Sequence, residues 1–402
     1  MDKDNEKAST IKILKKENGR ISVEETTEEN IISRHPLVEI LDDFVQRIDD
    51  IISAASSMIP AAGKIFNNRI DKLNARINEA EKKLKEGTPA EVSHASAELL
   101  DISYTSERIA RSKLQEVLAK SLFIDIFAEY DYFFGLVLKE LYEQREDLLS
   151  SLSRQISFAE LVKFRDLDAV KNSVLELEIE NIRRESYVEQ FEILKRKFGI
   201  TLTAFAEWPK FVEAAQRRNL MVHCGGHVSG QYLDVCEEQK YVFPTRPIIN
   251  SRLEIPGKYF IDCAELVCRV GVMLTHTLWR KLLPKEKESA DDELNNQIYR
   301  LLCAKRWGLA AEIGLYALTP TMTQGTKEMT HRIRICNTAI ALKKSQRHDE
   351  KERLLANFDW SASIRDFRLA LAVLSDEHTK AIQIMKEIGK KGELVDEVGY
   401  HQ

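Results

Sequence analysis

One short segment of the sequence places an arginine, an amide and an imidazole near the end of a predicted helix. Residues 217–226 read RRNLMVHCGG. Asn219 and His223 are four residues apart, so they share one face of a helix, and Arg218 stands beside Asn219. The two glycines that follow can leave a helix through a left-handed backbone conformation. The segment therefore predicts three groups that can act together on one ligand.

These three side-chain types meet the needs of RNA cleavage by the RNA's own 2′-hydroxyl group. That reaction needs a group that takes a proton, a group that gives one to the leaving oxygen, and a cation beside the phosphate. His223 can exchange protons near neutral pH, and Arg218 would stabilise the phosphate. Asn219 would orient the histidine or the scissile phosphate. Because one histidine cannot readily serve both sides of an in-line displacement, we expect two chains to join their helices around a two-fold axis.

A purely structural interpretation of the same segment stays open at this point. An arginine followed five positions later by a histidine is expected about 0.6 times by chance in a chain of this composition, so the pattern alone has a high false-positive rate. Arg218 could instead form an ion pair with Glu213 or Glu237. His223 would then bind the free carbonyl groups at the end of the helix.

The segment resembles the signature of HEPN domains, a family of small all-α units. In that signature an arginine, a polar residue, three variable residues and a histidine lie near the end of a helix. Arg218, Asn219 and His223 match it position for position, and residues 225–233 resemble its continuation in large HEPN proteins of bacterial defence systems. The resemblance covers about residues 95–285. It implies a metal-independent endoribonuclease that acts as a homodimer on an RNA substrate, as a toxin or an antiviral effector.

The resemblance leaves two alternatives. Some HEPN units are not catalytic, so the chain could be an interaction scaffold that binds protein partners, or a monomeric helical adaptor. One HEPN subgroup carries a tyrosine two positions after the histidine and is silenced there by nucleotidylation. Gly225 stands at that position in this chain, so we do not expect this control.

The composition is that of an ordinary folded protein. Of the 402 residues, 44% are hydrophobic and 31% are charged, which excludes a disordered chain. Only 16 Gly and 9 Pro occur, and apolar residues recur at spacings of three and four, so the predicted fold class is all-α, with a helical-bundle core. The net charge of −5 provides no general positive field, so RNA has to be bound at a local site.

Several predicted helices must position the segment. The helix that carries it is expected over residues 208–224, because Pro209 suits a first helical turn. A second helix over 257–283 closes the same unit, and the aromatic-rich stretch 121–152 supplies its core. Residues 228–256 lose the helical period, and the sequence YVF within them favours an extended surface segment.

A long helical pair precedes this unit. Apolar residues between 70 and 84 alternate at spacings of three and four, which predicts packing against one partner helix. That partner is either the next helix of the same chain or a second copy in a dimerising coiled coil. Thr88 and Glu91 have the spacing of a capping box, so the next helix is expected to begin directly after Thr88.

The chain is predicted to consist of four segments. The first is a polar tail or a small hairpin around the turn dipeptide Asn18-Gly19. The last contains paired amphipathic helices at intervals of about 35 residues, which indicates an irregular helical-repeat region that binds a protein or ligand trigger. The predicted segments are 1–32 (tail or hairpin), 33–94 (N-terminal helical extension), 95–285 (HEPN-like domain) and 286–402 (C-terminal helical repeats).

No cofactor and no metal site is expected. The six cysteines contain no C-x-x-C pair and no Cys/His spacing typical of zinc sites, and no G-x-x-x-x-G-K phosphate loop occurs. The N-terminus is polar and acidic, and charges interrupt the most apolar stretch. We therefore expect a cytoplasmic protein with no membrane partner.

Overall fold

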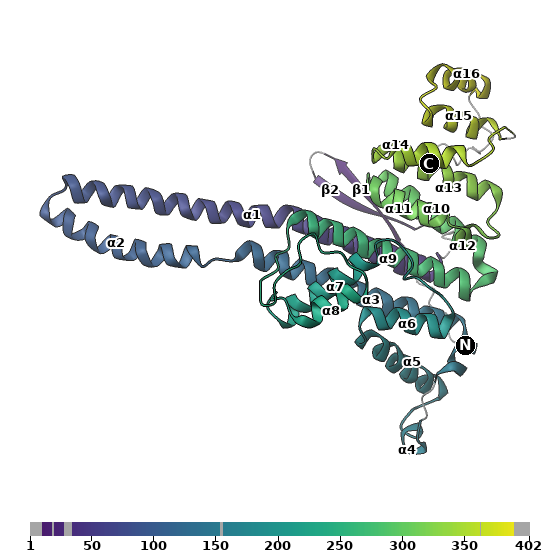
Figure 1. Cartoon of the computed structure of the whole chain (residues 1–402), viewed down its shortest axis with the longest axis horizontal. Helices are drawn as coiled ribbons and strands as arrows, with labels where there is room; N and C mark the ends of the chain where they lie inside the picture. The colour runs from purple at the N-terminus through teal and green to yellow at the C-terminus, as the bar shows by residue number, and fades with distance from the viewer. Residues whose placement is uncertain (1–9, 18–19, 28–33, 153–155, 362, 390–402) are drawn as a thin grey trace.

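The computed structural model describes residues 10–17, 20–27, 34–152, 156–361 and 363–389 (Figure 1). Over these residues the protein is all-α apart from one antiparallel hairpin, in which β1 (Thr10–Glu17) pairs with β2 (Arg20–Thr27). The hairpin is one of the two predicted forms of the N-terminal segment. The Asn18-Gly19 turn lies outside the described residues.

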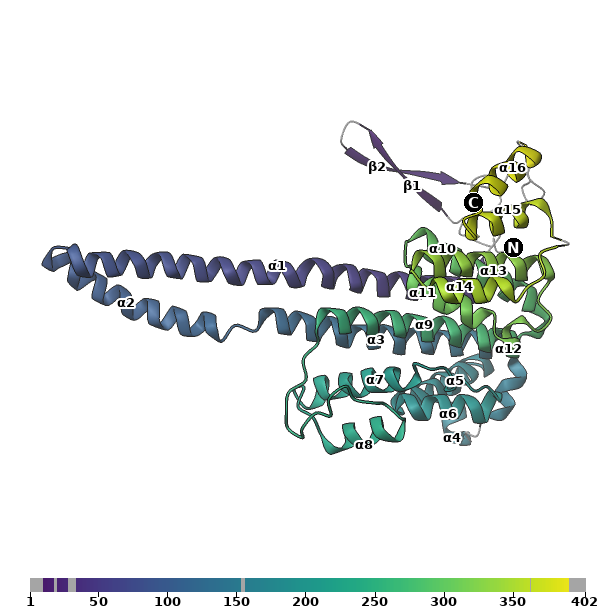
Figure 2. The same ribbon diagram turned by 45° about the horizontal axis from the view of Figure 1, so that its top comes forward.

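Two long helices form an arm that extends from the rest of the molecule (Figures 1 and 2). The arm consists of the second half of α1 (Pro36–Glu86) and of α2 (Pro89–Ala110). Leu73 and Ala80 of α1 are buried against Ala95 and Ile102 of α2, so the partner helix belongs to the same chain. The capping box is also confirmed, since the Thr88 backbone N–H donates to Glu91 at 2.7 Å.

The body of the molecule is built around two central helices. In Figure 2, α3 (Leu114–Gln144) and α9 (Gly257–Leu282) lie between the first half of α1 and α7 (Trp208–His223). Phe44 of α1 stacks on Phe133 of α3, with ring centroids 4.1 Å apart. Gly271 of α9 faces both rings, and a Cβ there would come within 2.4 Å of Phe44. Close helix packing therefore requires glycine at this position.

Smaller helices complete the body around α7. Ser186 caps α6, and Gly199 ends it with a φ of 63°, a left-handed conformation that favours glycine. Ser157 likewise caps a short helix through a capping box with Glu160. These elements are η1 (Glu146–Ser151), α4 (Phe158–Leu161), α5 (Leu167–Arg184), α6 (Tyr187–Phe198) and α8 (Gly230–Glu238).

The C-terminal helices form antiparallel pairs joined by tight turns. The three turns share one geometry, with a positive φ at Lys305, Gln346 and Asp376. In each turn the next backbone N–H donates to the carbonyl five residues earlier, as from Arg306 to Leu301 at 2.9 Å. The elements are η2 (Pro284–Glu286), α10 (Lys287–Cys303), α11 (Trp307–Ala317), α12 (Pro320–Thr323), α13 (Glu328–Lys344), α14 (His348–Ala356), α15 (Arg365–Leu374) and α16 (His378–Ile388).

The YVF stretch at 241–243 has no regular secondary structure and lies at the surface, where Val242 is 85% exposed. One isolated bridge in this region joins His227 to Arg252. One feature differs from the sequence predictions: residues 230–238 form α8, although no helix was predicted between 228 and 256. The reason is local: Ser229 caps α8 by accepting from the Tyr232 N–H at 3.2 Å, and a helix of nine residues is too short to show a clear period.

The largest apolar core joins helices from three of the predicted segments. It contains residues 37–55 of α1 together with residues of α3, α7, α9, α10 and α11. The core thus continues across the predicted boundaries at 94/95 and 285/286. No helix within the described residues combines the length and the apolar character needed to cross a bilayer.

Buried tyrosines in this core are expected to make the folded protein less stable at alkaline pH. Burial raises the pKa of Tyr142 to about 12 and raises the pKa of Tyr130 well above its usual value. Because the folded state keeps these hydroxyls protonated, their contribution is complete below about pH 10 and is lost as the pH rises further. We expect the midpoint of thermal unfolding, followed by circular dichroism, to fall between about pH 10 and about pH 11.

Tyr142→Phe provides the matched comparison for this prediction. The Tyr142 hydroxyl is buried and has no hydrogen-bond partner among the described residues, so its removal should not lower the midpoint near neutral pH. The variant should lose less stability than the wild type above about pH 10. An identical alkaline decline in both proteins would contradict the role of Tyr142.

Candidate active site

The helix that carries the predicted segment forms as expected. Helix α7 is held by its apolar face, on which Phe211, Ala214 and Ala215 are almost completely buried. It ends at His223, and Gly225 and Gly226 follow with φ angles of 60° and 86°. These left-handed conformations favour glycine, so the Gly-Gly pair is what turns the chain away after the histidine.

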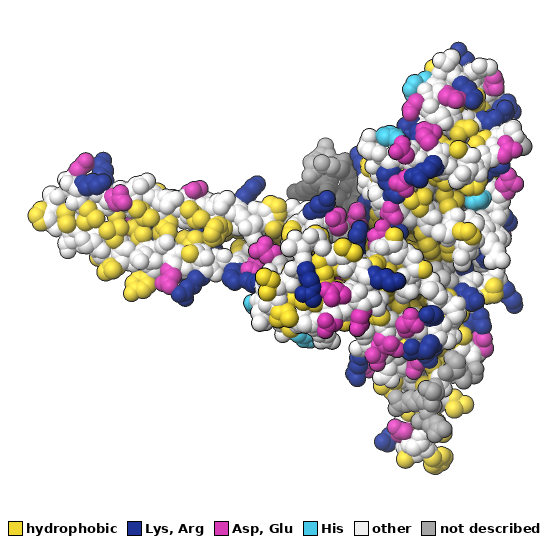
Figure 3. Space-filling view, in the orientation of Figure 1, with side chains coloured by type: hydrophobic (Ala, Val, Ile, Leu, Met, Phe, Trp, Pro, Cys, Tyr) yellow, Lys and Arg dark blue, Asp and Glu magenta, His cyan; other side chains and the backbone are white. Residues whose placement is uncertain are grey.

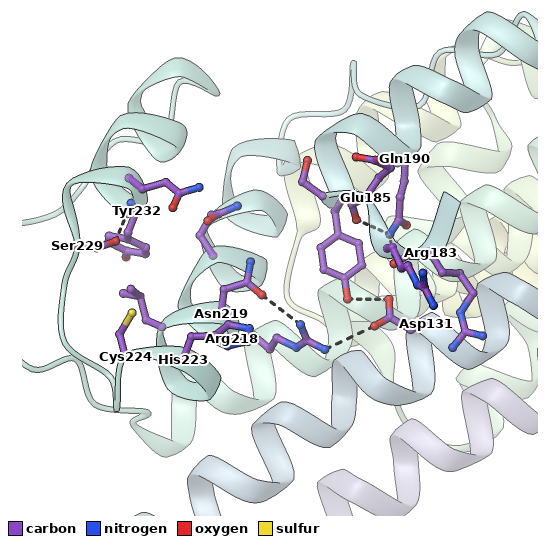
Figure 4. A pocket seen from close by; sticks show the side chains of 16 residues that line it. Asp131, Arg183, Glu185, Gln190, Arg218, Asn219, His223, Cys224, Ser229 and Tyr232 are labelled. Atoms are coloured by element: carbon purple, nitrogen blue, oxygen red, sulfur yellow. Dashed lines mark hydrogen bonds and ion pairs between the residues drawn. The ribbon is translucent and has the colours of Figure 1, made fainter. Parts of the chain in front are cut away.

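Arg218, Asn219 and His223 all line one pocket of about 420 Å³. Its opposite wall comes from the end of α5 and the start of α6, including Arg183 and Gln190 (Figure 4). Arg184 also lines the pocket. Gln190 is buried and donates to the carbonyls of Arg183 and Glu185 at 3.3 and 3.0 Å, which fixes this turn. The structure therefore brings the three predicted residues to one cavity that also contains two further arginines.

The Arg218 guanidinium is oriented by two neighbours. Figure 4 shows it between Asn219 and Asp131, joined to each by a dashed line. Its Nη1 donates to Asn219 Oδ1 at 3.1 Å, and its Nη2 lies 3.6 Å from Asp131 Oδ2. Tyr187 completes the chain by donating its hydroxyl to Asp131 Oδ1 at 2.8 Å. Asp131 on α3 and Tyr187 on α6 thus position a cation carried by α7.

The charge of Asp131 is balanced between opposing effects. Burial raises the pKa of this carboxyl above its usual value, whereas the Tyr187 hydroxyl, Arg218 and Arg183 act to lower it. Burial likewise raises the pKa of Tyr187 well above its usual value, and the Asp131 charge adds to that rise. The tyrosine therefore stays a hydrogen-bond donor over the whole physiological range.

His223 lies at the solvent-exposed end of the same pocket. Within the described residues, its ring takes part in no hydrogen bond or ion pair, so it does not bind the carbonyls at the helix end. The neighbouring His227 does bind there, with Nδ1 3.0 Å from the carbonyl oxygen of Cys224. His223 is therefore available to a ligand or to a second chain.

The structural interpretation assigned Arg218 to the wrong acid. Glu213 pairs with Arg217 instead, with Arg217 Nε 2.8 Å from Glu213 Oε1. Glu237 pairs with Arg246 at 2.7 Å. The reason is helical spacing: residues 213 and 217 are four apart and share a face, whereas residue 218 points about 100° away, towards the pocket.

Glu213 is the centre of a buried polar network beneath the site. It also accepts hydrogen bonds from the hydroxyls of Tyr232 at 2.6 Å and of Tyr259 at 2.7 Å. Arg217 lies 4.0 Å over the Tyr259 ring and donates to the Glu254 carbonyl at 3.0 Å. The network ties α7 to α8 and α9, so Arg217 supports the helix while Arg218 faces the pocket.

The residues that orient Arg218 do not follow from local spacing in the sequence. Asp131 and Tyr187 precede it by many residues and lie on other helices, so no local spacing connects them to α7. Asp131 is one of several charged residues in the aromatic-rich stretch 121–152, so nothing in the sequence singles it out.

Among the described residues, no group of three or more His, Cys, Asp or Glu side chains could hold a metal ion. Comparisons of the chain with protein-family models, with curated proteins and with solved structures find no match.

Proposed function

We propose that this protein is a metal-independent endoribonuclease whose active site is the pocket of Arg218, Asn219 and His223. The observation that supports the proposal is the contrast between two side chains in one cavity. Asp131 and Asn219 hold the Arg218 guanidinium in place, whereas His223 is exposed and forms no hydrogen bond or ion pair with any described residue. A fixed cation suits a phosphate, and a free imidazole suits proton transfer.

In the proposed reaction, the RNA's 2′-hydroxyl group attacks the adjacent phosphorus atom. An imidazole removes the hydroxyl proton, the bond from phosphorus to the 5′-oxygen breaks, and an imidazolium returns a proton to that leaving oxygen. The products are a 2′,3′-cyclic phosphate and a 5′-hydroxyl group. Arg218 stabilises the negative charge that develops on the phosphate, and Asn219 keeps the guanidinium oriented.

A homodimer would supply both proton-transfer groups. Within one chain, the pocket contains one histidine, and an in-line displacement needs a base and an acid on opposite sides of the phosphorus. A second copy related by a two-fold axis would bring its own exposed His223 to the RNA. The proposed active form is therefore a dimer with a composite site.

The proposed biological role is based on the resemblance of residues 217–233 to HEPN proteins of bacterial defence systems. We propose a toxin or antiviral effector in the cytoplasm, with the C-terminal helix pairs α10–α16 binding the protein or ligand that triggers it. Their paired arrangement is typical of helical arrays that bind partners.

The experiment that tests the proposal identifies the chemical groups at the ends of the cleaved RNA. Purified protein is incubated with tRNA and total RNA in excess chelator, and the products are analysed for 2′,3′-cyclic phosphate and 5′-hydroxyl ends. We expect both ends, and no cut in an RNA that carries 2′-O-methyl groups throughout, because the nucleophile is blocked. The rate per chain should fall when dilution separates the dimer. Cleavage of the methylated RNA would contradict attack by the 2′-hydroxyl group. Complete inactivity on every RNA would contradict the proposed function and favour the interaction scaffold.

A further inference from the structure

A second cavity lies on the arm, away from the candidate active site. It has a volume of about 570 Å³ and is formed between α1 and α2 where the arm approaches the body. Thr105 and Ser112 supply two hydroxyl groups to its lining, and no carboxylate lines it. Its charged residues are all cationic: Arg69, Lys72, Arg76 and Arg108.

Three of these cations have no acidic partner. Arg69, Lys72 and Arg108 are exposed, and within the described residues none of them forms an ion pair or hydrogen bond. Arg76 is the exception, with Asp101 at 2.8 Å and Glu98 at 3.4 Å. Like charges held in one groove repel one another, so an anion bound between them is favoured. Because the protein as a whole carries a net charge of −5, this local excess of cations stands out.

An exposed aromatic side chain borders the same groove. Tyr104 is 74% exposed and precedes Arg108 by four residues, so the two lie side by side on α2. Figure 3 shows Lys and Arg side chains along the lower edge of the arm, towards the body. Cations that track a phosphate backbone beside an aromatic ring on which a base can stack are the elements of single-stranded nucleic-acid binding.

We propose that this cavity, the arm groove, binds the phosphate backbone of single-stranded RNA, with a base stacked on Tyr104. This inference rests on the proposed function, because the bound RNA is taken to be the substrate of the pocket at Arg218. Helix α3 links the two places: Leu114 begins it beside the arm groove, and Asp131 lies about 26 Å further along its axis. The arm groove thus selects RNA long enough to reach from the arm to the active site.

The test measures RNA binding separately from cleavage. A fluorescently labelled single-stranded 2′-O-methyl RNA is titrated with the full-length protein, and its anisotropy gives the affinity. The groove variant is the triple substitution Arg69→Ala, Lys72→Ala, Arg108→Ala. The control is Lys64→Ala, Lys82→Ala, Lys85→Ala. It removes the same charge from exposed lysines of α1 that do not line the arm groove and that, within the described residues, form no ion pair or hydrogen bond.

We expect the groove variant to bind at least about tenfold more weakly at moderate salt, and the control to bind like the wild type. Losing about three phosphate contacts should also reduce the slope of log K against log salt by about 2. Tyr104→Ala should weaken binding without changing that slope. Equal weakening by both triple variants, or no change in the groove variant, would overturn the inference.

Two further outcomes separate this inference from the proposed function. If the groove variant loses affinity but the wild type cuts no RNA, the arm groove stands and the ribonuclease fails. If the wild type cuts RNA and the groove variant cuts long RNA equally well, the ribonuclease stands and the arm groove fails. Binding of phosphatidylserine vesicles in place of the methylated RNA would assign the cations to a lipid surface and overturn the inference.

Discussion

Replacing His223 with alanine is expected to slow RNA cleavage by about 10² to 10⁴-fold, the usual range for the loss of a general acid or base. His223 is exposed and touches no described side chain through a hydrogen bond or ion pair, so its removal should leave the fold unchanged. The rate is measured under single-turnover conditions in excess chelator, and circular dichroism verifies the fold. In a composite dimer site one substitution removes both imidazoles, which places the expected loss towards the upper end of that range.

His227→Ala is the matched control for this substitution. The two histidines are four residues apart and both exposed, but His227 does not line the pocket and binds the Cys224 carbonyl instead. The control should cleave at close to the wild-type rate. If His223→Ala and His227→Ala were equally active, the imidazole would have no part in the reaction and the proposed site would be wrong.

Replacing Arg218 with alanine in the same cleavage assay tests the stabilisation of the phosphate charge, where His223→Ala tests proton transfer. Removing the cation should cost about 10² to 10³-fold in rate, because the developing phosphate charge loses its stabilising partner. Arg218→Lys should recover little of that loss, because a lysine cannot bridge Asn219 and Asp131 with a planar guanidinium.

The local features of this fold follow from local signals in the sequence. The beginning of α2 at Thr88, the end of α6 at Gly199 and the exit from α7 at Gly225 each depend on side chains within a few residues. Capping boxes and left-handed glycines act over one helical turn, so spacing alone predicts them. Asn219 and His223 share one helix face, with Arg218 beside Asn219, for the same reason.

The contacts between helices could not be predicted in this way. Arg218 is paired with Asp131 of α3, and the choice of that acid is made by how α3 packs against α7. The sequence suggested Glu213 as the partner of Arg218. Glu213 does accept a hydrogen bond from an arginine, but that arginine is Arg217. Adjacent helical residues point about 100° apart, so two neighbouring arginines have opposite roles, and only the packed structure shows which one faces the pocket.

The partner of the apolar seam of α1, residues 70–84, could not be predicted either. The sequence left open whether this seam packs within one chain or between two chains. Its spacing of apolar residues is the same for both, and the packing of Leu73 and Ala80 against α2 shows an intramolecular pair. This leaves the other faces of both helices exposed, and the arm groove lies between the two helices at the edge of their seam. The periodicity of a helix describes its buried face and gives little information about what the exposed face binds.

Replacing Glu213 with alanine is expected to lower the free energy of unfolding by about 3 to 5 kcal/mol, the usual cost of leaving a buried charge without its partner. The carboxylate is buried and accepts from Arg217, Tyr232 and Tyr259, so the substitution breaks contacts from α7, α8 and α9 together. Urea unfolding followed by circular dichroism gives the free energy.

The controls for this prediction separate lost charge balance from lost packing. Glu238→Ala, at an exposed position of α8, should change the free energy by no more than about 0.5 kcal/mol. The double substitution Glu213→Leu, Arg217→Met should recover part of the loss, because it removes both buried charges and keeps the volume. A loss below about 1 kcal/mol in Glu213→Ala would show that water reaches the Arg217 guanidinium once its partner is gone. Helix α7 would then be held by its apolar face at Phe211, and the network beneath the pocket would not be what fixes Arg218 and His223 in place.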